Sequence, residues 1–115
     1  MLVKRAYLND GTTIGVCIGT DRHIYAIERG PDGARTGWTD LDPGKSGKAG
    51  RQFTSVPDVT SNGVEVTIDA TAPTGAPGVE DYWSTWENVY RDGKWSGWVN
   101  TGGRAAPFLP PPIPR

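Results

Sequence analysis

The sequence has one cysteine, one histidine, one methionine and almost no net charge, and each scarcity excludes a class of function. A single cysteine, Cys17, forms neither an intrachain disulfide nor a cysteine zinc cluster. With a formal net charge of −1, the chain has no basic field for nucleic acid. His23 is the sole histidine and no nucleophile motif lies near it, so we expect no enzyme and no catalytic residue.

Long apolar runs are also missing. No stretch has eighteen consecutive apolar residues, and the first residues lack the apolar core of a signal peptide. We therefore expect no membrane insertion, no signal peptide, cytoplasmic synthesis, and a place on a virion or particle surface or release by a route other than Sec. We predict no cofactor and no metal, because the acidic pairs Asp40/Asp42 and Glu80/Asp81 lie in turn-rich segments where carboxylates stay solvated.

The chain has 16 glycines and 10 prolines among 115 residues and no sustained helical period, which predicts an all-β fold. Its organisation is a duplication: Asp32-Gly33-x-x-Thr36-Gly37-Trp38 returns 60 residues later (98 − 38) as Asp92-Gly93-x-x-Ser96-Gly97-Trp98. Upstream, residues 13–20 align with residues 64–71, and the Pro- and Gly-rich segment 72–80 reads as a loop inserted into the second copy.

Each copy is predicted to be a four-stranded antiparallel meander. The first strands are residues 2–8 and 53–60, each followed by a turn that contains Asn and Gly. After the second turn, Val64, Val66 and Ile68 alternate with Glu65, Thr67 and Asp69, which predicts a half-buried strand from residue 64. The third strands are residues 24–29 and 83–90, and the fourth strands carry Trp38 and Trp98. The domain boundaries are a duplicated β domain over 1–103, with repeats at 2–44 and 52–103, and a Pro-rich C-terminal arm over 104–115.

Segments of the first copy, residues 14–21, 24–27 and 36–41, together with Trp95-Ser96-Gly97-Trp98 of the second, resemble blades of bacterial lectin-type β-propellers of the tectonin-like or fucose-binding kind. The first copy departs from the pattern, since Arg35 stands where the first tryptophan of that motif belongs. A propeller needs four to eight blades, so the resemblance implies completion by self-association as a trimer or tetramer. The alternative from the residues is a small β-sandwich within a larger assembly.

The resemblance implies carbohydrate binding between blades, with aromatic platforms and polar partners. The candidate carbohydrate-binding residues are Trp86, Trp95, Trp98, Glu87, Arg91, Trp38 and Glu28. Repeated tryptophans also fill the space between sheets: packing is the favoured interpretation for Trp38 and Trp98, and both interpretations stay open for Trp86 and Trp95.

We thus expect a non-catalytic recognition and assembly protein, lectin-like, acting as a homo-oligomer. The alternative is a structural or decoration subunit of a virion or injection-type particle. In that alternative the candidate assembly residues Phe108, Leu109 and Ile113 of the Pro-rich arm dock on neighbours.

Overall fold

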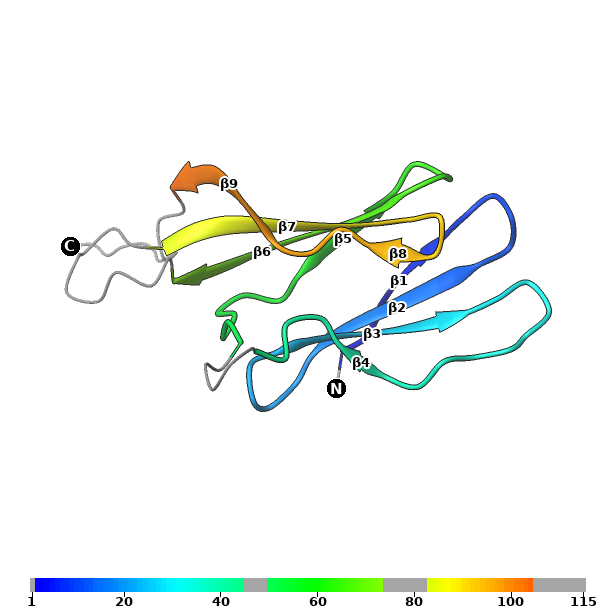
Figure 1. The fold of residues 1–115 in the computed structure, drawn as a ribbon, viewed down its shortest axis with the longest axis horizontal. Coiled ribbons are helices and arrows are strands. Elements are labelled where there is room, and N and C mark those ends of the chain that lie inside the picture. Colours follow the sequence, from blue (N-terminus) through cyan, green and yellow to red (C-terminus); the bar gives the residue numbers. More distant parts are fainter. Residues whose placement is uncertain (1, 45–49, 74–82, 105–115) are drawn as a thin grey trace.

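The computed structural model describes residues 2–44, 50–73 and 83–104, all in strands, turns or irregular segments and none in a helix. Two antiparallel sheets account for the strands (Figure 1). The first sheet has the order β1-β2-β3-β4, with strands β1 (Lys4–Tyr7), β2 (Thr13–Ile18), β3 (Ile24–Arg29) and β4 (Thr39–Asp40). The second has β5 (Asp58–Ser61), β6 (Val66–Pro73) and β7 (Trp83–Arg91), with β8 (Lys94–Trp95) and β9 (Val99–Arg104) both pairing with β7. The all-β class is confirmed, with four strands in one sheet and five in the other.

Tight turns join the strands where the sequence offers residues that accept positive φ. Gly11 and Gly63 both have φ near +93°, which only glycine adopts freely. Between β7 and β8, Asp92 and Gly93 have φ of 52° and 80°, the combination that a two-residue hairpin turn requires. These turns force each copy to fold back on itself as a meander.

Three predicted boundaries are wrong. The first strand of the second sheet begins at Asp58 rather than at residue 53, because Pro57 has no N–H to donate. Val64 is 55% exposed and precedes β6, since Asn62 Oδ1 accepts hydrogen bonds from the N–H groups of Val64 and Glu65 and keeps them in the turn. β6 extends to Pro73, so the predicted inserted loop does not start at residue 72.

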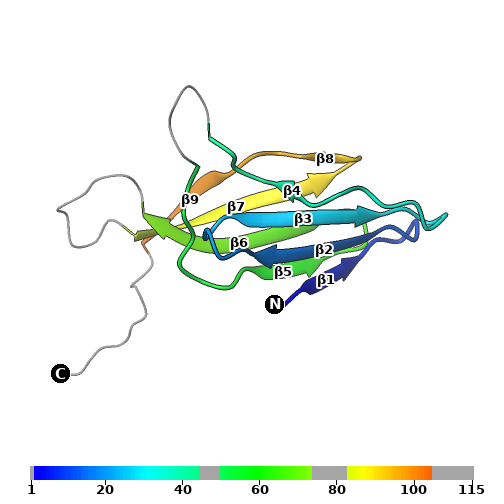
Figure 2. The ribbon, with the colours of Figure 1, turned by 90° about the horizontal axis from the view of Figure 1, so that it is seen from below.

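The two sheets pack face to face around one hydrophobic core (Figures 1 and 2). The first sheet contributes Ala6, Ile14, Val16 and Ile24, and the second contributes Val66, Ile68, Ala70, Ala72 and Tyr90. The side chains of β6 alternate as expected: the even-numbered residues from 66 to 72 are buried, and Thr67, Asp69 and Thr71 face away from the core. We call the core side of each sheet its inner face and the opposite side its outer face.

The first strands of the two sheets lie side by side and run in the same direction. Lys4 Nζ is 3.7 Å from Asp58 Oδ1, and Ser61 Oγ donates a 2.7 Å hydrogen bond to the carbonyl of Tyr7. Further along, the N–H of Asn9 donates to the carbonyl of Gly63. Contacts thus join residues at a constant offset of 54 (58 − 4 and 61 − 7), so the second sheet follows the first as a rotated repeat.

Strand pairing shows which positions of the two sheets correspond. Thr13 pairs with Arg29 in the first sheet, and Val66 pairs with Tyr90 in the second. The correspondence of Thr13 with Val66 has an offset of 53 (66 − 13) and corrects the predicted alignment of residues 13 and 64, because hydrogen bonds to Asn62 Oδ1 keep Val64 and Glu65 in the turn, so that β6 begins only at Val66. Val66 and Tyr90 lie on the inner face, whereas Thr13 and Arg29 lie on the outer face. The outer face of the first sheet therefore corresponds to the inner face of the second.

Phe53, from the segment that connects the sheets, completes the core. It is fully buried, and its ring centroid lies 4.5 Å from that of Trp98. Its N–H donates to the carbonyl of Arg22 in the first sheet, and the next residue, Thr54, donates to Thr71 in the second. One segment therefore ties the two sheets together.

Neither predicted fourth strand contains its tryptophan. Trp38 immediately precedes β4, and Trp98 lies between β8 and β9. The reason is Thr36 and its counterpart Ser96, whose hydroxyls bond the backbone of the third strand and interrupt the strand pairing there.

Replacing Phe53 with alanine should remove about 3–5 kcal/mol from the free energy of unfolding, the cost of a cavity at a fully buried aromatic position. Urea denaturation followed by tryptophan fluorescence measures it. Val64→Ala is the matched control, with a change within about 0.5 kcal/mol because Val64 is exposed. Equal effects of the two substitutions would contradict the assigned core.

Candidate functional site

A hollow of about 190 Å³ opens between the two sheets. Glu28 and Thr36 of the first repeat line it, and so do Tyr90, Gly93 and Trp95 of the second repeat. Two of the carbohydrate-binding candidates, Glu28 and Trp95, therefore meet here although 67 residues separate them in the sequence (95 − 28). We call this the inter-sheet hollow.

A partly buried hydrogen bond joins two of the residues that line it. The hydroxyl of Tyr90 donates to Glu28 Oε2 at 2.7 Å and joins β7 to β3. Burial, and then the hydrogen bond to Glu28, raise the pKa of Tyr90, so that the hydroxyl remains a protonated donor at neutral pH. The carboxylate of Glu28 is thereby held in place as an acceptor.

Trp95 forms the aromatic wall. Its ring meets that of Tyr90 edge-on, with centroids 5.2 Å apart, and its side chain is half-buried. Gly93 lies at the rim with φ of +80°, and a Cβ built there would meet nothing within 4 Å. The rim is thus open, and one aromatic ring and one fixed carboxylate border the same space.

The repeated Thr/Ser-Gly-Trp motif positions these groups. Thr36 Oγ1 accepts a hydrogen bond from the N–H of Glu28 and donates to the carbonyl of Gly37. Ser96 makes the same pair of bonds, with the N–H of Val89 and the carbonyl of Gly97. Both hydroxyls therefore join the third strand to the residues just before the tryptophan. In the first repeat, this contact holds the backbone of Glu28 in place beside the hollow.

Trp86 and Trp98 lie away from this hollow, within the packing. The guanidinium carbon of Arg51 lies 4.0 Å from the ring centroid of Trp86, a cation–π contact that covers the ring. Asp42 fixes Arg51 by a 2.5 Å ion pair. Trp98 packs on Phe53. Neither ring is placed as an open platform.

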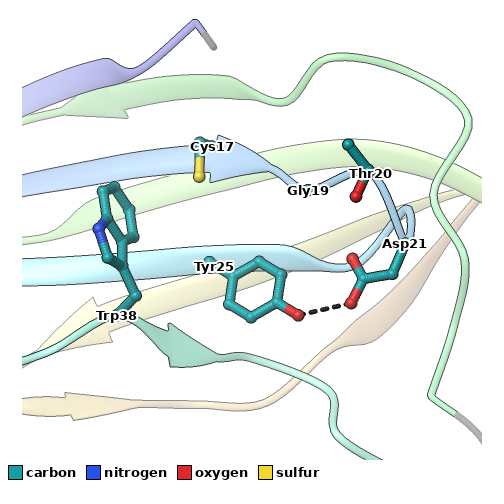
Figure 3. Close-up of a pocket in the computed structure, with 6 residues that line it drawn as sticks. All are labelled: Cys17, Gly19, Thr20, Asp21, Tyr25 and Trp38. Carbon is teal, nitrogen blue, oxygen red and sulfur yellow. Dashed lines mark hydrogen bonds between the residues drawn. The ribbon is translucent and has the colours of Figure 1, made fainter.

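Trp38, the counterpart of Trp98, lies on the opposite side of the first sheet and is 46% exposed. It lines a second hollow, of about 320 Å³, with Cys17, Gly19, Thr20, Asp21 and Tyr25 (Figure 3). We call this the outer hollow. The hydroxyl of Tyr25 donates a 2.5 Å hydrogen bond to Asp21, which raises the pKa of Tyr25 to about 12 and lowers the pKa of Asp21.

The remaining candidates lie elsewhere. Glu87 is on the outer face of the second sheet, where it pairs across the strands with Asp69. Arg91 is 3.1 Å from Glu65 at the end of the β7–β8 hairpin. The seven predicted residues therefore lie in separate places, and the inter-sheet hollow brings two of them together, Glu28 and Trp95. The assembly residues Phe108, Leu109 and Ile113 fall outside the described residues.

His23 has a structural contact. Its Nδ1 lies 2.7 Å from Asp40 Oδ2, which joins the start of β3 to the end of β4. Among residues 2–44, 50–73 and 83–104, no group of three or more His, Cys, Asp or Glu side chains is arranged to hold a metal ion. The same part of the chain has no helix long and apolar enough to cross a membrane.

Sequence reasoning missed Tyr90, Arg51 and Phe53. A signal for Tyr90 was present, since it is an aromatic residue two positions before the Asp92-Gly93 turn. No pattern pointed to Arg51 or Phe53, because both lie in an irregular segment whose position depends on the packing of the two sheets.

A scan against protein-family models gave no match to this chain. Searches of the curated proteins and of the solved structures gave none either. The function is therefore argued from the geometry of the hollows and the faces.

The two corresponding tryptophans should differ in their contribution to stability. Trp98→Ala should lower the free energy of unfolding by about 2–4 kcal/mol because it exposes Phe53, whereas Trp38→Ala should cost less than about 1 kcal/mol in the isolated chain. Urea denaturation at low chain concentration compares the pair. A larger loss for Trp38→Ala would contradict the assignment of Trp98 to the core and of Trp38 to the surface.

Proposed function

We propose that the protein is a non-catalytic recognition and assembly protein that binds a glycan in the inter-sheet hollow and acts as a homo-oligomer. One observation carries the ligand proposal: the ring of Trp95 and the hydrogen-bonded pair of Glu28 and Tyr90 border one hollow between the two repeats. An aromatic face stacks on the C–H face of a sugar, and a carboxylate accepts hydrogen bonds from its hydroxyls.

The size of the hollow supports a small ligand. Pockets for drug-sized molecules have volumes of roughly 300–1,000 Å³. At about 190 Å³, the inter-sheet hollow has room for a single saccharide unit. The rest of the glycan would leave the hollow over Gly93. Because Glu28 and Tyr90 already bond each other, little ordering is needed on binding.

The strand arrangement supports blade-like repeats. In a propeller, each blade follows the previous one by rotation about an axis, and the blades are meanders of four strands. Here the first strands lie side by side in the same direction, and each sheet uses the opposite face for the shared core. Closure of a ring by three or four copies, with six or eight such units, is part of the proposal.

The alternative is a structural or decoration subunit of a virion or injection-type particle. It depends on residues 105–115, which lie outside the described part of the chain. The glycan proposal rests instead on described residues on both sides of the inter-sheet hollow.

Methyl glycosides of fucose, the common hexoses and their N-acetylamino derivatives, titrated into the protein, should include at least one that changes tryptophan fluorescence and gives a 1:1 isotherm per chain. Trp95→Ala and Glu28→Gln should each weaken that binding at least tenfold, equivalent to about 1.4 kcal/mol. Glu28→Gln retains an oxygen that accepts from Tyr90, so it removes the charge while the fold is kept.

Val99→Ala, a change at an exposed apolar residue outside the hollow, serves as the control and should leave the affinity unchanged. Unfolding curves of all variants separate lost binding from lost folding. Binding that survives both substitutions in folded protein would place the ligand elsewhere and overturn this site.

A further inference from the structure

The outer face of the first sheet combines unpaired positive charge with an incomplete apolar surface. Arg5, Arg29 and Arg35 line a hollow of about 400 Å³ there, and none of the three forms an ion pair within the described residues. Tyr7, on the same face, is 64% exposed. Trp38 separates this hollow from the outer hollow. Arg5, Tyr7, Arg29 and Arg35 are exposed on this face in the single chain.

The outer face of the second sheet has the opposite charge. Asp58 pairs with Asp69, and Asp69 pairs with Glu87, so three carboxylates form one row across β5, β6 and β7. We call it the acidic row. Like charges directly opposite each other destabilise a sheet. The nearest described cation, Lys4, lies at one end of the row, 3.7 Å from Asp58.

The contact inside the chain predicts how another unit would dock. Within the chain, the hydrogen bond from Tyr90 to Glu28 fixes which rows of the two inner faces meet. The next row of the first sheet holds Lys4, Val16 and Ala26, whose counterparts in the second sheet are Asp58, Asp69 and Glu87.

On the inner face of the second sheet, the row opposite Lys4, Val16 and Ala26 holds Val59, Ile68 and Asn88. The corresponding residues of the first sheet are Arg5, Gly15 and Ile27, on its outer face. Repeating the same contact between two chains therefore brings the acidic row opposite Arg5.

From these two faces we infer that a second copy of this chain docks head to tail, with the acidic row of one copy against the Arg5-bearing outer face of the next. This rests on the assembly half of the proposed function and names its interface. The contact joins two different faces, so it is heterologous and continues from copy to copy until a ring closes. Each chain then offers its acidic row to one neighbour and its Arg5-bearing face to the other.

The acidic row predicts a conflict between folding and assembly. Burial, then the charges of Glu87 and Asp58, raise the pKa of Asp69 above its ordinary 3.8. A carboxyl with a raised pKa favours the folded state below its ordinary pKa, and this contribution is lost as the pH rises through the raised value. Asp69→Asn should therefore raise the melting temperature of dilute, unassociated chain at pH 7 and have little effect at pH 3. The same variant should assemble less well at pH 7.

The deciding experiment is a charge-swap pair followed by native mass. Full-length protein at micromolar concentration should give a discrete species of three or four times the 12.4 kDa chain. Arg5→Glu, which changes one face, and Asp58→Lys, which changes the other at the position opposite Arg5, should each be monomeric and folded, since both side chains are exposed. The double variant Arg5→Glu/Asp58→Lys should recover the assembly, because the exchanged charges attract again at every interface, whatever the number of chains in the ring. Val64→Ala, at an exposed residue outside both rows, is the control and should assemble as the unmodified protein does.

Three outcomes overturn the inference. A monomeric unmodified protein removes the second copy as occupant, and single variants that assemble normally remove the two faces. A folded double variant that stays monomeric would show that the faces do not pair with each other. Glycan affinity at the inter-sheet hollow is measured separately on the unmodified protein, so a protein that assembles as expected but binds no glycan refutes the ligand proposal alone.

Discussion

The packing of opposite faces determines most of this structure. In the first sheet, Ile14, Val16 and Ile24 point into the core. In the second sheet, the core residues occupy positions that correspond to the outer face of the first sheet. A two-fold sandwich of identical units would bury the same face twice and leave two equivalent outer faces. Here the two outer faces differ, one with arginines and aromatic rings and the other with threonines and carboxylates. The asymmetry of the chain as a whole is a consequence of the way its two halves meet.

This constraint also explains why corresponding residues diverge after duplication. Gly15 and Cys17 occupy the outer face where the second sheet has Ile68 and Ala70. Ile27 and Val3 pack over Gly15, within 3.0 and 3.4 Å of where its Cβ would lie. In the second sheet, Phe53 and Arg51 contact Trp98 and Trp86 instead. The two corresponding tryptophans also differ in their surroundings: Trp98 packs on Phe53, whereas Trp38 is exposed.

The sequence predicted the parts that depend on local chemistry. Turn residues such as Gly11 and Gly93 and the alternation in β6 identified the two meanders, because positive φ and two-residue periodicity are local properties. The strand ends near Pro57 and Asn62 were misplaced, since side-chain bonds to the backbone compete there with strand pairing. Contacts between the two sheets could not be predicted from local patterns. Glu28 was named as a candidate, but its partner Tyr90 lies 62 residues away in the sequence.

The inter-sheet hollow and the outer faces are linked by the same register. The bond from Tyr90 to Glu28 fixes the register of the two sheets, and this register sets the width of the hollow and, in the proposed assembly, the rows that would meet between two chains. In that assembly, Arg29 corresponds to Tyr90 and Val89 corresponds to Glu28, so the acceptor and the donating hydroxyl would both be missing between chains. A hollow between chains would therefore lack the fixed carboxylate and have cations in its place. Equal repeats would give one kind of site throughout the proposed ring, whereas these two repeats would give one carboxylate-bearing hollow per chain and a separate charged contact for assembly.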